Sequence, residues 1–149
     1  MRLEIGHVVL KVRSLDISMP FYCAVLGMRQ RRRRKFNGGQ IAFLTFGERD
    51  HDIGLLEAGA FDETRDGTHA GLAHIAFCIG DRVELLRAFK KHLDAMGIEP
   101  ERMVEHRVSR SIYLRDPDGI ELEIYVDSDA PIRKADRELG MTDPPLHLD

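Results

Sequence analysis

Apolar and polar residues alternate in short runs along most of the chain, and the spacing of the apolar positions changes between strand-like and helix-like stretches. Alternation with a period of two predicts strands, because successive side chains of a strand lie on opposite faces. Helical spacing predicts helices over residues 16–26 and between Asp81 and Gly97. The order β-α-β-β-β therefore occurs twice. The predicted strands are residues 3–12, 28–35, 40–46, 52–57, 72–79, 102–106, 111–114 and 120–126.

Both predicted helices carry signals at their ends. Pro20 is tolerated in a first helical turn, and Gly27 ends the first helix. Asp81 is expected to cap the second helix, with Glu84 three residues later. The residues expected to be buried are Ile17, Phe21, Val25 and Leu26 in the first helix, and Leu85, Leu86, Phe89, Leu93 and Met96 in the second.

Size and composition fit a globular protein. The 149 residues are 43% hydrophobic and 32% charged, which suits a single domain with a core over residues 1–127, followed by a loose or surface-draped tail over residues 128–149. The net charge of −3 gives no electrostatic reason to expect nucleic acid or membrane as a partner. No long apolar run or signal-peptide pattern is present, so we expect a cytoplasmic protein. Cys23 and Cys78 are expected to be reduced core residues.

Two histidines and one glutamate form a candidate metal site. His7 and His74 occupy the same position in the two halves, within IGHVVLKV and LAHIAFCI. Glu123 lies on the polar face of the last strand, where a buried carboxylate needs a partner or a metal. Two imidazoles and one carboxylate suit Fe(II), Mn(II) or another divalent ion, with coordination positions left open. Either histidine alone would fit a hydrogen-bonded core residue better, but the duplication favours metal binding.

The double β-α-β-β-β pattern, the paired histidines and the Asp-Pro-Asp-Gly turn followed by Glu123 resemble the vicinal oxygen chelate superfamily. This superfamily includes glyoxalase I, fosfomycin-resistance enzymes, bleomycin-binding proteins and type I extradiol dioxygenases. The resemblance implies an α+β fold, in which two modules, at about residues 3–57 and 72–127, form a curved mixed sheet around a metal cleft. It covers about residues 3–127.

Individual positions of the sequence count against some members of this superfamily. Glyoxalase I has a fourth ligand, a glutamate, on the last strand of the first half, but Gly54 stands at that position here. Glu57 is an odd number of residues away and is expected to face the other side of the strand. Bleomycin-binding proteins do not need the three metal ligands, so the presence of all three candidates here counts against that group. We see no clear match to the phosphonate-binding and potassium-binding residues of the fosfomycin-resistance enzymes.

Three further residues resemble the extradiol dioxygenases. Tyr113, in YLRDPDG, would hydrogen-bond a catechol oxygen and help its deprotonation. His51, in RDHDIGL, would face the O2 site, stabilise the negative charge that develops there and donate a proton. His106, in EHRVSRSIYL, would fix the substrate oxygen. The resemblance thus implies an Fe(II) enzyme that opens the ring of an aromatic diol with O2. The connection between His51 and His74 is longer than in that group, and many of its members have two such domains.

Two alternatives remain open. One is a non-redox metalloenzyme of the same superfamily, such as a lyase, isomerase or thiol transferase. The other is a metal-free small-molecule binding module. A homodimer or higher homo-oligomer is expected in either case. The Arg31–Lys35 run is interpreted as an exposed or edge strand protected by its charge. His69, His92 and His147 are expected to be solvated.

Overall fold

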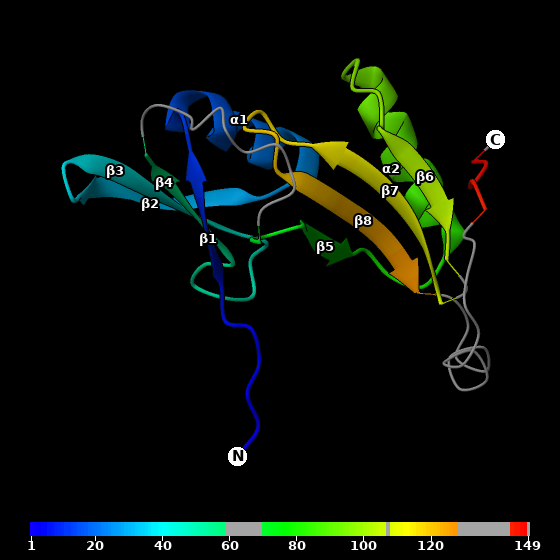
Figure 1. Ribbon diagram of the computed structural model, residues 1–149, viewed down its shortest axis with the longest axis horizontal. Helices are drawn as coiled ribbons and strands as arrows, with labels where there is room; N and C mark the ends of the chain where they lie inside the picture. The colour runs from blue at the N-terminus through cyan, green and yellow to red at the C-terminus, as the bar shows by residue number, and fades with distance from the viewer. Residues whose placement is uncertain (59–69, 107, 128–143, 149) are drawn as a thin grey trace. The chain divides into compact units, whose positions relative to one another are not determined.

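The computed structural model describes residues 1–58, 70–106, 108–127 and 144–148 (Figure 1). The predicted order β-α-β-β-β is confirmed in both halves. The elements are β1 (Val8–Val12), α1 (Leu15–Leu26), β2 (Arg29–Phe36), β3 (Gly39–Thr45), β4 (Ile53–Glu57), β5 (His74–Cys78), α2 (Val83–Ala95), β6 (Arg102–Glu105), β7 (Ser109–Arg115) and β8 (Glu121–Asp127).

The chain divides into two compact units. The first comprises Met1–Gly71 with Asp116–Asp118, and the second comprises Leu72–Arg115 with Gly119–Asp149. Each unit holds a four-stranded sheet, in the order β1-β4-β3-β2 or β5-β8-β7-β6. The first strand of each half runs parallel to the last, and the other pairs are antiparallel. The two units therefore share one topology, which is an α+β arrangement.

In the first unit α1 packs on one face of the sheet, against β3, β4 and β2. Its buried residues are Leu15, Ser18, Tyr22 and Val25. Of the four residues that were expected to be buried, only Val25 is; Ile17 is 61% exposed. The prediction was wrong because two polar side chains, Ser18 and Tyr22, lie on the buried side of the helix.

Those two side chains are buried because they donate hydrogen bonds to the Asp-Pro-Asp-Gly turn. Ser18 Oγ donates to Asp118 Oδ2 (2.5 Å), and the Tyr22 hydroxyl donates to Asp116 Oδ2 (2.9 Å). The Arg13 backbone N–H donates to Asp118 Oδ1 (2.8 Å). Burial raises the pKa of Tyr22, and the neighbouring Asp116 charge raises it further, so this phenol stays protonated. The turn is thus held to α1 by charged acceptors that are themselves buried.

In the second unit α2 packs on β7 and β8. Leu86 and Leu93 are buried as expected, but Met96 is 40% exposed because the helix ends at Ala95. Arg82, not Asp81, is the N-cap residue, and no side chain caps this end of the helix. The buried aliphatic residues of the described strands of this unit are Ile112, Leu114, Leu122, Ile124 and Val126.

The N-terminal strand is shorter than predicted. Residues 3–7 lie outside β1, and Leu3 and Ile5 are 82% and 78% exposed. The neighbouring strand β4 begins at Ile53, which pairs with Val8, so the alternating residues before Val8 have no strand to pair with. His7 consequently lies directly before β1 and not within it.

Pro20, the two cysteines and the Arg31–Lys35 run were also the subject of predictions. Pro20 lies inside α1, beyond its first turn, because the helix begins at Leu15. Cys23 is half-buried and Cys78 is exposed, so the expectation of core cysteines was wrong for Cys78. The interpretation of the Arg31–Lys35 run is confirmed, since β2 is the edge strand of its sheet and is largely exposed.

The end of the tail pairs with β6. Pro145 forms a bridge with Val104, and the Leu146 N–H donates to the Met103 carbonyl (3.0 Å). Leu146 is 6% exposed, so this end of the tail is docked. Residues 128–143 and His69 lie outside the described residues. Neither described helix is long and apolar enough to cross a membrane.

Asp118→Ala should lower the free energy of unfolding by about 2 kcal/mol, because it leaves the Ser18 hydroxyl and the Arg13 N–H without their acceptor. Urea unfolding measures this change. Asp94→Ala is the control, because Asp94 pairs with Lys90 on an exposed helix surface. This substitution should lower the free energy of unfolding by less than about 0.5 kcal/mol. Equal effects of the two substitutions would show that the turn contributes no special stability.

Candidate active site

In the second unit, a histidine and a glutamate from neighbouring strands face each other. The register of the parallel β5–β8 pair sets His74 opposite Glu121 and Ala76 opposite Glu123. His74 Nε2 lies 3.1 Å from Glu123 Oε2. Glu123 is 8% exposed, and its other oxygen accepts a hydrogen bond from Ser111 Oγ (2.6 Å). The carboxylate is therefore held from both neighbouring strands of its sheet.

The His74–Glu123 geometry fits a shared metal. Two donors at adjacent positions of an octahedral ion, with bonds of about 2.1 Å, lie about 3.0 Å apart. The observed 3.1 Å is close to that spacing. Neutral imidazole and carboxylate are also donor types that divalent first-row metals accept. These two residues can hold part of a metal's coordination shell.

Tyr113 and His106 form a second pair on the same sheet. Tyr113 pairs with Glu123 across β7 and β8, and its hydroxyl lies 2.8 Å from His106 Nε2. His106 directly follows β6. Burial, followed by the charge of Glu123, raises the pKa of Tyr113 to about 12, so its hydroxyl is protonated at neutral pH. A protonated phenol at this place can donate a hydrogen bond to a charged ligand oxygen.

Two residues around this pair were not predicted. The Arg102 guanidinium lies over the Tyr113 ring, 3.8 Å from its centroid, and donates two hydrogen bonds of 2.9 Å to Glu121. Glu121 Oε1 lies 4.0 Å from His74 Nδ1. The hydrogen bonds from Arg102 hold the pKa of Glu121 below its usual value. The alternation with Glu123 was the available signal for Glu121, while Arg102 is found only through the β6–β7 register.

In the first unit, His7 lies beside His51. Their ring centroids are 4.5 Å apart, and the ring of Phe43 approaches His51 edge-on at 4.8 Å. His51 Nδ1 lies 2.8 Å from Asp50 Oδ2, and the hydrogen bond with His51 lowers the pKa of Asp50. Asp50 and Phe43 were not among the predicted residues. The contact of two histidines that are distant in sequence brings two of the predicted site residues together in this unit.

The six predicted site residues therefore form three local pairs. His7 and His51 belong to the first unit, whereas His74–Glu123 and Tyr113–His106 belong to the second. Among the described residues, no group of three His, Cys, Asp or Glu side chains is arranged to hold a metal ion. The set His7, His74 and Glu123 stays a prediction.

Two residues of the first unit bear on the glyoxalase-type ligand set. The Glu57 carboxylate accepts a hydrogen bond from the Leu15 N–H (3.0 Å) at the start of α1, so it faces the helix side. At Gly54 the space for a side chain is tight, because an added Cβ atom would lie 3.2 Å from Val9 Cγ2. Gly54 has no side chain to offer a metal, and the Glu57 carboxylate is engaged by α1.

Comparisons with known proteins agree with this architecture. A sequence model of the Glyoxalase/Bleomycin resistance protein/Dioxygenase superfamily matches residues 4–124. Biphenyl-2,3-diol 1,2-dioxygenases 2 and 3 from Rhodococcus globerulus are 32% and 33% identical over 84% of this chain, which spans 63% and 64% of their lengths. A lactoylglutathione lyase from Neisseria meningitidis is 29% identical over 78% of this chain and 86% of its own length. A solved glyoxylase/bleomycin resistance protein/dioxygenase domain from Frankia sp. EAN1pec is 25% identical, with a TM-score of 0.72 over 85% of this chain and 93% of that one.

His74→Ala should weaken the binding of a divalent metal by at least about 100-fold, because it removes a donor next to Glu123. Titration with Mn(II) followed by metal analysis of the dialysed protein measures this loss. His92→Ala, an exposed histidine of α2, is the matched control and should bind metal like the wild type. Unchanged metal content in His74→Ala would remove His74 from the ligand set.

Proposed function

The chain belongs to the Glyoxalase/Bleomycin resistance protein/Dioxygenase superfamily, and within it we propose that the protein is an Fe(II)-dependent extradiol dioxygenase. Its substrate would be a catechol-like aromatic, whose ring is opened with O2. Support comes from the 32% and 33% identity to two biphenyl-2,3-diol dioxygenases and from the pairing of Tyr113 with His106 beside Glu123.

We propose that His7, His74 and Glu123 hold the metal, with both modules acting as one domain over residues 1–127. Fe(II) in that set would supply coordination for both catechol oxygens and for O2, and its charge would lower the pKa of the bound phenol. Mn(II) or another divalent metal is the alternative. A single carboxylate ligand leaves a net positive charge, which suits an anionic catechol.

The Tyr113–His106 pair is the observation that favours catechol chemistry most. The hydroxyl is protonated at neutral pH, since burial and Glu123 raise its pKa to about 12. Tyr113 would therefore donate a hydrogen bond to the charged catechol oxygen, and His106, at 2.8 Å, would orient that hydroxyl. A centre that only polarises a carbonyl does not need this second pair of groups.

His51 would serve the O2 side of the reaction. Asp50 engages Nδ1 of the imidazole, which leaves Nε2 as the nitrogen that exchanges a proton with the reacting oxygen. In the overall reaction, one carbon–carbon bond beside the diol breaks and both oxygen atoms of O2 enter the product. The four electrons come from the catechol and the ring that opens, so no other reductant is needed.

Two other functions are separated from this one by simple tests. A non-redox lyase, isomerase or thiol transferase, suggested by the similarity to a lactoylglutathione lyase, would not consume O2. A metal-free binding module would contain no stoichiometric metal after purification without chelator. The expected homo-oligomer is a separate prediction, which sedimentation or light scattering would test.

The experiment that tests the proposal is O2 uptake by protein reconstituted anaerobically with Fe(II) and offered 2,3-dihydroxybiphenyl and a panel of simpler catechols. We expect O2 uptake matched one to one by the yellow ring-opened product. Absence of uptake from protein shown to contain iron would contradict the proposal and favour the non-redox relatives.

Tyr113→Phe should keep the metal and lower kcat at least about 100-fold, because it removes only the hydroxyl that donates to the substrate oxygen. Tyr125→Phe makes the same change on the neighbouring strand β8 and should retain turnover within about twofold. Steady-state O2 consumption and metal analysis measure both effects. Normal turnover by Tyr113→Phe would exclude this residue from the reaction.

A further inference from the structure

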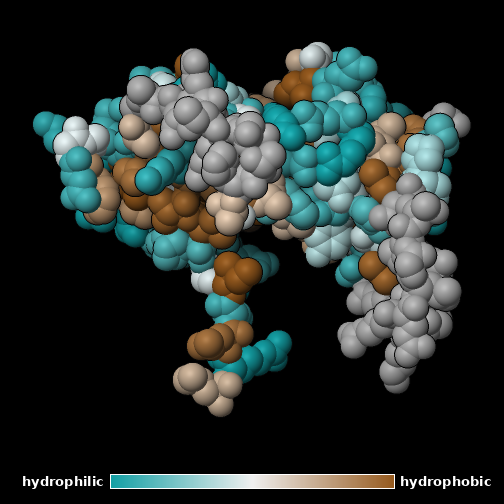
Figure 2. Space-filling model, viewed as in Figure 1, coloured by the Kyte–Doolittle hydropathy of each residue, from teal (hydrophilic) through white to brown (hydrophobic). Residues whose placement is uncertain are grey.

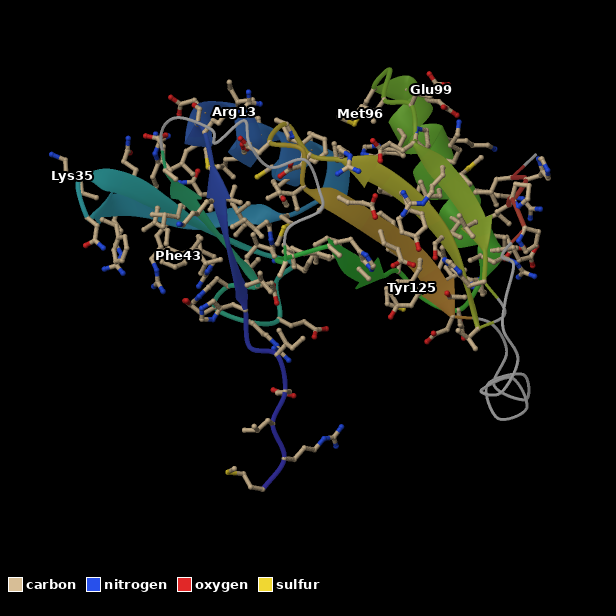
Figure 3. The ribbon with its side chains drawn as sticks, in the orientation of Figure 1. Arg13, Lys35, Phe43, Met96, Glu99 and Tyr125 are labelled. Atoms are coloured by element: carbon tan, nitrogen blue, oxygen red, sulfur yellow. The ribbon has the colours of Figure 1, made fainter. Side chains whose placement is uncertain are left out.

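The face of the first sheet that lies opposite α1 carries an aromatic ring between histidines and arginines. Phe43 on β3 projects from this face, as Figure 3 shows, and Figure 2 shows an apolar patch over β1, β4 and β3. The ring of Phe43 contacts His51 at 4.8 Å, and His51 contacts His7 at 4.5 Å. The Phe43 ring therefore lies next to the histidine pair that we assign to the metal and O2 side of the site.

Two arginines of the edge strand β2 border the same ring. The Arg32 and Arg34 guanidinium carbons lie 5.0 Å and 5.7 Å from the Phe43 centroid, within the range of cation–π contact. Strand alternation places Arg34 on the face opposite to that of Arg33 and Lys35. Arg33 pairs with Asp16 of α1, which places Arg33 on the helix side. A continuous row of side chains thus runs from His7 through His51 and Phe43 to Arg34.

The two arginines differ in charge compensation. Arg32 donates to Asp50 Oδ2 at 2.6 Å, the same oxygen that engages His51, so its charge is locally neutralised. Arg34 is exposed, and no carboxylate lies within 4.0 Å of it among the residues that the structure describes. Its cation–π contacts with Phe43 and Phe36 hold the guanidinium near the ring without neutralising it.

The second sheet gives a useful contrast. Arg102 and Arg115, which border the Glu123 face there, both pair with Glu121, at 2.9 Å and 3.3 Å. Those guanidinium groups are already matched with a carboxylate and serve to hold Glu121. Within the part of the chain that the structure describes, Arg34 has a guanidinium near candidate site residues and no carboxylate within 4.0 Å, so its charge is available to a ligand.

We propose that Arg34 recognises a carboxylate on the substrate, so that the preferred substrates are catechols with a short, carboxylate-bearing side chain. This inference rests on the proposed function. The diol would lie toward His7 and His51, the aliphatic link would pass along the edge of Phe43, which is 8% exposed, and the carboxylate would meet the Arg34 guanidinium. Successive steps of 4.8 Å from His51 to Phe43 and 5.7 Å from Phe43 to Arg34 suit a link of about two or three carbons. A guanidinium pairs with carboxylate in a two-point geometry that ammonium does not match.

The test compares 3-(2,3-dihydroxyphenyl)propionate with its methyl ester, which differ in charge but hardly in shape. The wild type should show the higher kcat/KM for the acid. Arg34→Gln should lower kcat/KM for the acid about tenfold and change that for the ester by less than about twofold. Lys35→Gln removes the same charge from the next residue, on the opposite face, and should change neither value.

The outcomes separate this inference from the proposed function. If both substrates consume O2 and Arg34→Gln affects them equally, or if Lys35→Gln has the same effect as Arg34→Gln, the inference is wrong and the dioxygenase activity stands. If neither substrate consumes O2, the dioxygenase proposal fails, and anaerobic calorimetry with the two ligands still tests Arg34. Tighter binding of the acid that is lost in Arg34→Gln alone would support the carboxylate site, whereas equal binding would overturn it.

Discussion

A buried carboxylate links three strands of the second unit. Glu123 is 8% exposed, and it is held by the Ser111 hydroxyl on one oxygen while His74 lies 3.1 Å from the other. A buried carboxylate needs such partners, because burying a charge without a hydrogen bond or a counter-charge is costly. Because its partners come from β7 and β5, the strand order β5-β8-β7 itself brings histidine, glutamate and tyrosine together. The fold and the candidate site therefore depend on the same pairing.

The hairpin that carries Glu123 also supplies the turn that packs on α1. Asp116 and Asp118 are 5% and 6% exposed, and their oxygens accept hydrogen bonds from Tyr22 and Ser18. One short stretch of sequence thus places the candidate ligand Glu123 on a strand and two carboxylates that bind α1 in a turn. Burial alone does not distinguish these carboxylates, and hydroxyl donors reach both kinds. Glu123 faces the imidazole of His74, whereas Asp116 and Asp118 accept from the Tyr22 and Ser18 hydroxyls and from Arg13.

Much of the fold could be predicted from the sequence, because strand alternation, glycine stops and the repeated histidine are local signals. The buried side of α1 could not, since Ser18 and Tyr22 are buried through hydrogen bonds to residues about 100 positions away. Leu3 and Ile5 continued an alternating pattern, yet β4 offers them no partner. Arg102 could not be predicted as a site neighbour for a similar reason. Its contact with Tyr113 depends on the register between two strands, which the pattern of a single strand does not encode.

We propose that His7, His74 and Glu123 bind one metal ion, although His7 belongs to a different unit from the other two. The most direct measurement is anomalous X-ray diffraction from a crystal of the protein grown with Mn(II). We expect one strong anomalous peak per chain, about 2.1 Å from an imidazole nitrogen of His7, an imidazole nitrogen of His74 and a carboxylate oxygen of Glu123. A peak bound by other residues, or one that leaves His7 out of the coordination shell, would contradict the account.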